Sequence, residues 1–249
     1  MVDAFHIAPT LPPDYQANYQ AKRFFEISPS RVRDADFGLS TDDWFLAPLT
    51  TTMRFAALEA LYGKTVPSSG QFMLKKRPKA IPDYVWATDD VPIVTATFKE
   101  VVEAMAPGEA EFRPFVMRWP DDEPVAGEWY LMNILNLVDC FDFERMGKPR
   151  PELTERRLTS AEALTPLEVW EQARLDQHYQ CRPVYIDPRP VGSLHIWRPL
   201  FHFYSVFCTS ELLEALKAAG VKRLHAERLG TRDDPIPVID WATLGVRAP

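Results

Sequence analysis

Two segments of the chain combine a short apolar run, a helical pattern and a second run with strand-like alternation. The first spans residues 91–119, VPIVTATFKEVVEAMAPGEAEFRPFVMRW, and its central part has the apolar spacing of an amphipathic helix. The residues predicted to be buried are Phe98, Val101, Val102 and Met105. Thr95 or Thr97 is suited to cap this helix. Pro107–Gly108 is suited to end it, and Pro114 interrupts the strand that follows.

The second segment, residues 203–229, repeats this order in the letters FYSVFCTSELLEALKAAGVKRLHAERL. A strand, SVFC, precedes a cap at Thr209 or Ser210, and Gly220 is suited to end the helix. The residues predicted to be buried in this helix are Leu212, Leu213 and Leu216. VVEAM in the first segment aligns with LLEAL in the second, which is compatible with a duplication or with chance. Both interpretations predict helices that alternate with short strands.

The rest of the chain predicts short elements joined by stiff loops, because it holds 23 proline and only 10 glycine residues. The further elements that we expect are strands over Arg23–Ser28 and Gln71–Arg77, a helix over Thr51–Gly63, a helix start at Ser40 or Thr41, and a partly helical stretch over 159–177. These patterns together predict a single α+β domain over residues 1–249. Within it we expect a less regular part at 1–70, a main region at 70–229 and an extended tail at 230–249.

The stretch GEWYLMNILNLVDCFDFER, residues 127–145, follows neither the helical nor the strand period. Polar residues recur among apolar ones at Asn133, Asn136, Asp139 and Asp142. EWYLMNIL is long enough for a buried strand, whereas VDCFDFER alternates differently, so we predict a junction near Asn136. Because Asn and Asp side chains satisfy backbone groups at such junctions, we expect a structural role for these residues in a bend of the core.

Composition and charge narrow the classes of function. The chain has 249 residues, 46% hydrophobic and 25% charged, as expected of a soluble globular protein. Its formal net charge of −7 disfavours a nucleic-acid binder and favours either basic partners or simple solubility. Neither a signal peptide nor a membrane-spanning run is visible, and Cys140, Cys181 and Cys208 have no disulfide spacing. We therefore expect a cytoplasmic protein.

The sequence contains no recognisable motif for catalysis or cofactor binding. It has no Gly-rich phosphate loop, no G-x-S-x-G and no H-E-x-x-H, so we expect no cofactor. His178 and Cys181 stand at the spacing H-x-x-C, but zinc requires four ligands, so we expect no metal. An enzyme of another class is the alternative, either with Cys140 beside His195 or His202 as nucleophile and base, or with a carboxylate pair in a cleft.

Two polar or aromatic runs are candidates for contacts with a partner. The acidic run WPDDEP, Trp119–Pro124, predicts a solvated hairpin turn, and its alternative role is a contact for a basic partner. The run LHIWRPLFHFYSVF carries aromatic residues that we expect mostly in the core, although one or two are suited to anchor an interface. These aromatic residues are Trp197, Phe201, Phe203 and Tyr204.

The stretch WYLMNILNLVDCFDFER, residues 129–145, resembles the signature of a bacterial immunity-protein family that is found beside polymorphic toxins. Its core has the form N-x-L-N-x-V-D-x-x-D. Residues 82–118 and 194–224, and more weakly 22–28, follow the family pattern in the same order, so that the resemblance covers residues 70–225. The residues that we assign to a structural signature are Asn133, Asn136, Asp139 and Trp197.

This resemblance implies an α+β protein that binds and neutralises a cognate toxin without catalysis. Many toxins that attack nucleic acids are basic, so we expect a basic toxin as partner, and neither nucleic acid nor a membrane. Because toxins differ within such families, contacts are expected on variable surfaces. The candidate contact residues are Asp121, Asp122 and Glu123, followed by Asp139, Asp142 and Glu144. The alternatives to this function are the enzyme described above and a scaffold or adaptor of a secretion gene cluster.

Overall fold

A computed structural model of the chain describes the elements that build its core. The described residues are 23–29, 37–38, 54–63, 65–72, 77, 80–86, 92–147, 150, 184–200 and 205–234. The predicted features that lie outside the described residues are the helix start at Ser40 or Thr41, the stretch 159–177, His178, Cys181, Phe201, His202, Phe203, Tyr204 and the tail from residue 235 onward.

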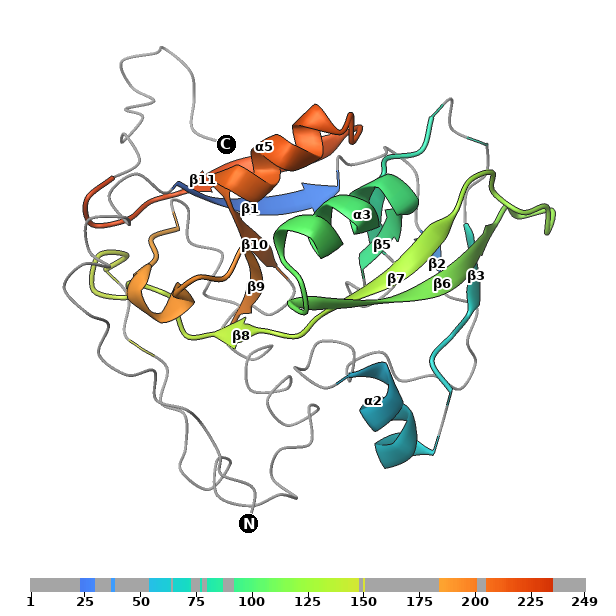
Figure 1. The fold of residues 1–249 in the computed structure, drawn as a ribbon, viewed down its shortest axis with the longest axis horizontal. Helices are drawn as coiled ribbons and strands as arrows, with labels where there is room; N and C mark the ends of the chain where they lie inside the picture. The colour runs from blue at the N-terminus through green and yellow to red at the C-terminus, as the bar shows by residue number, and fades with distance from the viewer. Residues whose placement is uncertain are drawn as a thin grey trace.

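The described residues form two mixed β-sheets with helices packed against them (Figure 1). The five-stranded sheet has the order β11-β1-β10-β9-β8, with strands β1 (Phe24–Pro29), β8 (Leu137–Val138), β9 (Ile196–Pro199), β10 (Val206–Thr209) and β11 (Leu224–Leu229). The six-stranded sheet has the order β2-β3-β6-β7-β5-β4, with strands β2 (Phe37–Gly38), β3 (Ser69–Phe72), β4 (Tyr84–Trp86), β5 (Pro92–Thr95), β6 (Ala110–Arg118) and β7 (Trp129–Ile134). The helices are α2 (Phe55–Tyr62), α3 (Ala96–Met105) and α5 (Ser210–Ala218), with a short 3₁₀ turn at Arg189–Val191. The predicted α+β class is confirmed.

Each sheet contains one copy of a unit made of four strands and a helix. In the first unit, α3 connects β5 to β6, and β7 lies between these strands and runs antiparallel to both. In the second unit, α5 connects β10 to β11, and β1 lies between them, again antiparallel to both. β4 flanks β5 in the first unit as β9 flanks β10 in the second. The recurring strand–helix–strand unit predicted from the sequence is therefore confirmed.

The two units also agree in the register of their strands. Each helix follows a threonine at the end of a strand, and this threonine pairs with an aromatic residue of the central strand: Thr95 with Trp129, and Thr209 with Phe24. The residues opposite these aromatic residues in the next strand are Phe115 and Leu229. The units differ in one connection, because β7 follows β6 directly, whereas β1 comes from the N-terminal part of the chain.

The structural alignment of the helices corrects the match of letters in the sequence. Counted from the capping threonines, Phe98 corresponds to Leu212 and Val102 to Leu216, and all four side chains are fully buried. Matching VVEAM with LLEAL instead places Val101 on Leu212, a shift of nearly one helical turn. That similarity of letters does not reflect structural equivalence.

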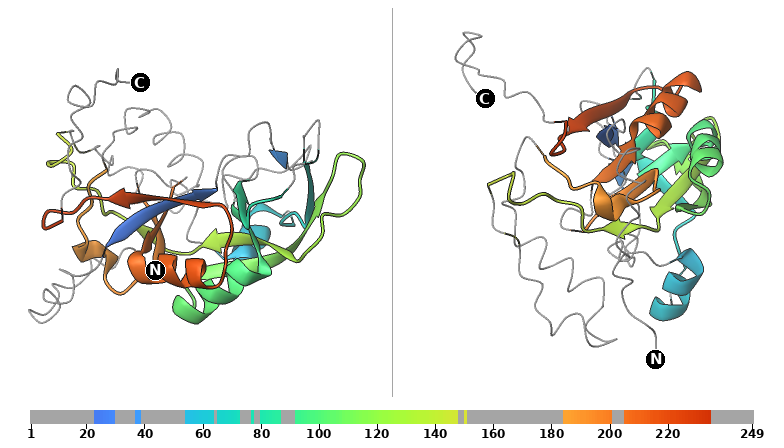
Figure 2. Two further views of the ribbon diagram at one scale, coloured as in Figure 1. Left: turned by 90° about the horizontal axis from the view of Figure 1, so that it is seen from above. Right: turned by 60° about the vertical axis from the view of Figure 1, so that its left-hand side comes forward.

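Helices α3 and α5 lie against each other on the same side of the two sheets and close one core (Figures 1 and 2). The buried residues of this core include Phe98 and Val102 from α3, Leu212, Leu213 and Leu216 from α5, and Ile27, Val94, Met132 and Cys208 from the sheets. Val101 and Met105, also predicted to be buried, are partly buried against it. Full burial of one such side chain contributes about 1.5–3 kcal/mol, so this shared cluster joins the two units.

The two helices are capped differently. The hydroxyl of Thr209 accepts a hydrogen bond from the backbone N–H of Leu212 at 3.5 Å, whereas the side chain of Thr95 makes no capping bond. After the end of α5, Gly220 adopts a positive φ of 79°, and its N–H donates to the carbonyl of Lys217 at 3.0 Å. This left-handed position strains residues other than glycine, which explains why Gly220 ends α5 as predicted.

The opposite face of the five-stranded sheet is covered by chain segments from residues 138–146 and 184–194. Trp197 is fully buried there, in edge-to-face contacts with Phe24 and Phe207 at centroid distances of 5.9 and 6.1 Å. Such contacts between aromatic rings add to the stabilisation that burial provides. The predicted core position of Trp197 is confirmed.

The chain passes from one sheet to the other where the broken period predicts a junction. β7 of the six-stranded sheet ends at Ile134, and β8 of the five-stranded sheet begins at Leu137. Asn136 lies between them, and its carbonyl accepts a hydrogen bond from the N–H of Arg198 at 2.9 Å. Asn133 is fully buried within β7.

Helix α2 docks against β6 through polar contacts. The N–H of Phe55, the first residue of α2, donates to the carboxylate of Glu111 at 2.6 Å, a favourable place for an anion. Arg113 forms an ion pair with Glu59 and stacks over the ring of Phe55 at 5.0 Å. The pKa of Glu59 is lowered, mainly by the hydrogen bond that its carboxylate accepts from Arg113.

Two strand predictions need correction. β3 begins at Ser69 rather than at Gln71, because its parallel partner in β6 runs from Val116 to Arg118. Pro114 does not interrupt β6, since it pairs with Tyr130 of β7 within a continuous strand. At Pro114 no described strand pairs with the outer edge of β6, so the missing N–H of proline leaves no gap in a ladder.

Candidate functional site

The hairpin of the first unit extends past its helix as an arm, residues 114–130, with a tip at residues 119–124 (Figure 1). At the tip, the N–H of Trp119 donates to the carbonyl of Glu123 at 2.8 Å, and that of Asp122 donates to the carbonyl of Trp119 at 2.9 Å. Asp122 has a positive φ of 67°, which aspartate tolerates better than most residues. The predicted hairpin turn is confirmed.

Arg77 holds this tip in place. Its Nη2 lies 2.6 Å from the carboxylate of Asp121 and 2.5 Å from that of Glu123, and its guanidinium stacks over the ring of Trp119 at 5.2 Å. The hydrogen bond to Glu123, opposed by desolvation and assisted by Asp121, raises the pKa of Arg77. Two of the three tip carboxylates are therefore partly neutralised. No local pattern indicates this role, because Arg77 lies far from the tip along the chain.

Asp122 is the most exposed of the three tip acids. Its side chain is 79% exposed, compared with 59% for Asp121 and 64% for Glu123. Its carboxylate lies 3.7 Å from Nη1 of Arg118, an exposed pair of the kind that contributes about 0–1 kcal/mol. Asp122 thus presents most of its charge to solvent.

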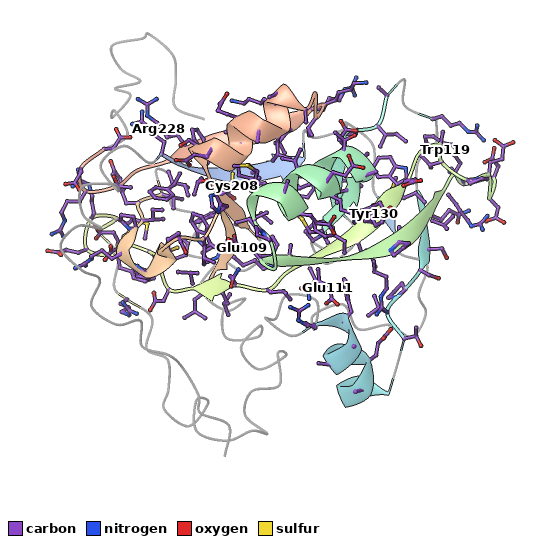
Figure 3. The ribbon with its side chains drawn as sticks, in the orientation of Figure 1. Glu109, Glu111, Trp119, Tyr130, Cys208 and Arg228 are labelled. Carbon is purple, nitrogen blue, oxygen red and sulfur yellow. The ribbon has the colours of Figure 1, made fainter. Side chains whose placement is uncertain are left out.

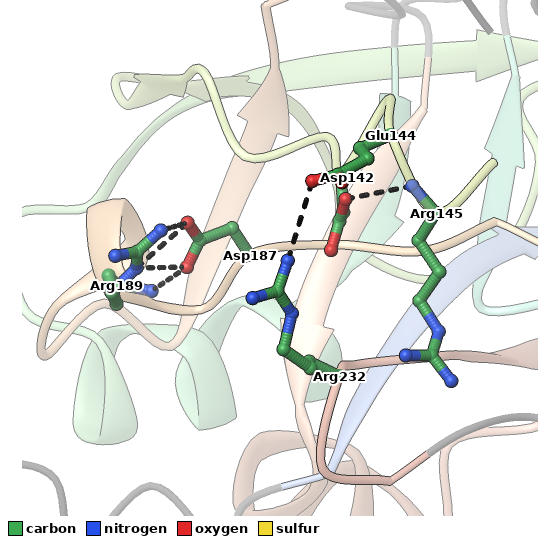
Figure 4. A network of polar contacts seen from close by, with 6 residues as sticks. All are labelled: Asp142, Glu144, Arg145, Asp187, Arg189 and Arg232. Carbon is green, nitrogen blue, oxygen red and sulfur yellow. Dashed lines mark hydrogen bonds and ion pairs between the residues drawn. The ribbon is translucent and has the colours of Figure 1, made fainter. Parts of the chain in front are cut away.

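The second group of candidate acids lies in a cluster of mixed charge, in the segment after β8 at the end of the fold opposite to the arm (Figure 1), and Figure 4 shows Asp142 and Glu144 of this group. The cluster is built from residues 139–146, 184–189 and 229–232. Backbone hydrogen bonds join these segments, from Asp142 N–H to the carbonyl of Tyr185 at 2.9 Å and from Ile186 N–H to that of Gly230 at 2.8 Å. The structure therefore brings Asp139, Asp142 and Glu144 together, well apart from the tip acids.

Each acid of this cluster has a partner. The pairs are Asp139 with Arg150, Asp142 with the backbone N–H of Arg145 (3.0 Å), Glu144 with Arg232 (3.7 Å) and Asp187 with Arg189 (2.5 Å). Burial, which Arg150 offsets only in part, raises the pKa of Asp139. Since arginines alternate with the acids, this surface is less acidic than the tip of the arm.

Glu109 links the two sheets at the start of β6, a role that is not predictable from the sequence (Figure 3). One carboxylate oxygen accepts hydrogen bonds from the backbone N–H groups of His195 (2.8 Å) and Ile196 (2.9 Å), where β9 begins. The other oxygen lies 3.6 Å from Nδ1 of His195. The only sequence signal is the position of Glu109 directly after Pro107–Gly108, and it does not identify partners 86 residues away.

The structure does not give Cys140 the properties of an activated nucleophile. Cys140 is fully buried, and this burial raises the pKa of its thiol to about 12. A reactive cysteine requires a lowered pKa. His195, its candidate base, faces Glu109. Across the residues that the structure describes, no group of three His, Cys, Asp or Glu side chains is arranged to hold a metal ion.

A comparison with protein families matches the immunity protein family Imm11 to residues 24–230. The chain belongs to the Imm11 immunity protein family. Membership indicates an immunity function and, in general, a toxin partner. The region matched to Imm11 begins at β1, earlier than residue 70, and includes both units, the arm and the mixed-charge cluster. No curated protein sequence matches the chain.

In the described part of the chain, no helix has both the length and the apolar character needed to cross a membrane.

Proposed function

We propose that this chain binds one cognate toxin at fixed stoichiometry in the cytoplasm of the producing bacterium and neutralises it by contact, without catalysis. The observation that carries the proposal is the family match over residues 24–230, which includes every element that builds the core. A buried, high-pKa thiol at Cys140 supports contact rather than covalent chemistry. We further propose that the gene for this chain belongs to a polymorphic toxin system, beside the gene for the toxin.

The contact includes the tip of the arm. Asp121, Asp122 and Glu123 stand there at the end of a hairpin held by Arg77, and the chain as a whole carries a formal charge of −7. A basic toxin is attracted to such a surface over a long range, which speeds the encounter. The group Asp139, Asp142 and Glu144 is the second candidate, because arginines alternate with its acids and make that surface less acidic than the tip.

The direct test is protection of cells. The toxin domain encoded beside the gene for this chain is expressed in a sensitive host, with and without the chain. We expect survival only with the chain, and a complex of fixed stoichiometry that persists in high salt when both are purified. Equal killing in both cultures would overturn the immunity function. Exchangeable binding to several components of a secretion cluster would instead favour the scaffold.

The role of the tip is tested by neutralising its charges. The triple variant D121N, D122N and E123Q retains the shape of the turn, because asparagine tolerates the left-handed position of Asp122. We expect association with the purified toxin domain to slow by about tenfold at low salt and to depend less on salt. The matched control is D139N, D142N and E144Q in the mixed-charge cluster. If only the control variant binds more slowly, the contact lies at that cluster.

A further inference from the structure

The side chains of β6 alternate between two faces of the arm, and one of these faces is largely exposed. Phe115 and Met117 are buried, whereas the residues between and before them are exposed or half-buried. Successive side chains of a strand point to opposite faces, so Phe112, Pro114 and Val116 share the face on which α3 lies. Tyr130 joins this face, because it pairs with Pro114 across the hairpin.

Helix α3 covers only the first part of this face. Lys99 of α3 places its ammonium group 5.9 Å from the ring centroid of Phe112 and 5.2 Å from that of Tyr130. Beyond this point Pro114 is exposed, and Val116 is 44% exposed. Among the described residues, Val116 is the large hydrophobic side chain that is exposed. The fold thus leaves an apolar strip uncovered at the middle of a regular strand.

The second unit closes the corresponding place. Arg228 is the equivalent of Pro114, since it pairs with Phe25 as Pro114 pairs with Tyr130. Arg228 forms an ion pair with Asp234, which also lies 4.0 Å from Arg23. The four-strand unit therefore does not by itself require an exposed apolar side chain at the position of Pro114, because the second unit has a paired arginine there.

The charges around the uncovered strip are mostly negative. Glu128 is exposed and accepts a hydrogen bond from the hydroxyl of Tyr130 at 3.1 Å. This hydrogen bond, assisted by desolvation and by the charges of Glu128 and Glu100, raises the pKa of Tyr130. The acids on α3, the arm and its tip are Glu100, Glu103, Asp121, Asp122, Glu123 and Glu128, and the cations are Arg77, Lys99 and Arg118. Six acids against three cations give this surface a formal charge of −3.

We propose that the strip formed by Pro114, Val116 and Tyr130 is the centre of the toxin contact, and that it receives an apolar or aromatic side chain set in a basic toxin surface. This inference rests on the proposed function and deepens it. Stable interfaces have an apolar or aromatic centre inside a polar rim, and tyrosine is frequent among the residues that dominate affinity. Arg77 holds the tip in place before binding, so the tip loses little conformational freedom on association.

The test measures the affinity of the purified toxin domain encoded beside this gene for Val116→Arg and for two comparison variants. Val116→Arg removes the apolar contact and places a cation against a basic partner, so we expect affinity to fall by about 30-fold or more. Val116→Thr keeps the branched shape of the side chain. We expect it to weaken binding by only about threefold, which is one third of the free-energy change expected for Val116→Arg. His225→Arg introduces the same side chain at an exposed strand position of the second unit and should bind like the wild type.

The outcomes separate the two levels of the proposal. If the wild-type chain does not bind the toxin domain, the proposed function fails. If the wild type binds and the folded Val116→Arg protein binds equally well, the function stands and the strip is overturned as its centre. If Val116→Arg does not fold, hydrogen exchange of the wild-type complex decides. Protection of residues 112–118 and 128–131 supports the strip, and protection confined to residues 139–146 and 229–232 overturns it.

Discussion

The two units of this fold share their strands, their register and one helix each, but they end differently. In the first, β6 and β7 continue past the helix into an arm with an exposed apolar strip and an acidic tip. In the second, β11 stops at Leu229, and the following turn folds back so that Asp234 pairs with Arg228 and Arg23. The end of the unit therefore exposes an apolar strip in the first unit, whereas ion pairs cover the corresponding position in the second. In the function proposed above, recognition lies on the first unit and the second unit has a structural role.

The comparison also shows how the units depend on each other. α3 and α5 bury their apolar faces in one cluster, and neither helix has a separate core within the described residues. β8 and Glu109 add two further links between the sheets. The part of the first unit from which the arm extends is therefore anchored on the second unit.

The largest expected effects come from the equivalent core residues Phe98 and Leu212. Phe98→Ala should cost about 3–5 kcal/mol of unfolding free energy, and Leu212→Ala about 2–5 kcal/mol, because both side chains are fully buried. Either substitution should destabilise both units together in a single urea transition. The matched controls are Glu100→Ala and Glu214→Ala, at equivalent exposed positions of the two helices, with changes within about 0.5 kcal/mol.

Hydrogen exchange provides the sharper form of this test. If Phe98→Ala lowers the exchange protection of the backbone amides in β6 and β7 but leaves that of β10 and β11 unchanged, the units are separate domains. The single domain predicted from the sequence would then be wrong.

A smaller effect is expected at Glu109, the link between the sheets. Glu109→Ala removes a charged acceptor from two backbone N–H groups of His195 and Ile196, which should cost about 2–3 kcal/mol. Glu109→Gln retains one acceptor oxygen and should cost roughly half as much. The free energy of urea unfolding measures both. Equal and small costs would show that the two sheets are held by their apolar core alone.

The elements of the fold follow closely from local patterns, whereas the surface does not. Thr209, Gly220 and the spacing of Leu212, Leu213 and Leu216 determine α5 through backbone geometry and burial, so the sequence alone predicts them. The slot of β1 between β10 and β11 depends on contacts between distant segments, and no periodicity encodes it.

The candidate site shows the same limit. The acidic run at the tip is visible in the sequence, and the turn that it predicts is present. Its neutralisation by Arg77 is not predictable, because the two lie 44 and 46 residues apart along the chain. Val116 stands between two buried residues in an alternating strand, and only the end of α3 determines that its face is uncovered.

The capping threonines allow a comparison at the same position of each unit. Thr209→Val removes the hydroxyl that accepts from the N–H of Leu212 and should cost about 1 kcal/mol. Thr95→Val should be neutral within about 0.5 kcal/mol, because the hydroxyl of Thr95 is buried and has no hydrogen-bond partner among the described residues. Thermal unfolding of the two variants measures the difference. Equal costs would mean that both hydroxyls act as caps in solution.

The smallest effects are opposite responses to pH at Glu59, beneath the first unit, and Asp139, beneath the second. The pKa of Glu59 is lowered by Arg113, so Glu59 stabilises the fold above its unfolded pKa, and this contribution is lost as the pH falls through the folded pKa. The pKa of Asp139 is raised by burial, so the folded state takes up its proton first and gains stability as the pH falls from 7 toward 4.

Two variants separate these responses when urea unfolding is measured at pH 7 and near pH 4. The stability advantage of the wild type over Glu59→Gln should shrink at the lower pH, whereas the difference between the wild type and Asp139→Asn should shift in favour of the wild type. We expect the shift at Asp139 to be less than about 1 kcal/mol, because Arg150 partly compensates the burial of its carboxylate. If the stability differences of the two variants changed with pH in the same direction, the assignment would be contradicted. The ion pair with Arg113 favours the charged form of Glu59 in the folded state, whereas burial disfavours the charged form of Asp139 by more than Arg150 favours it.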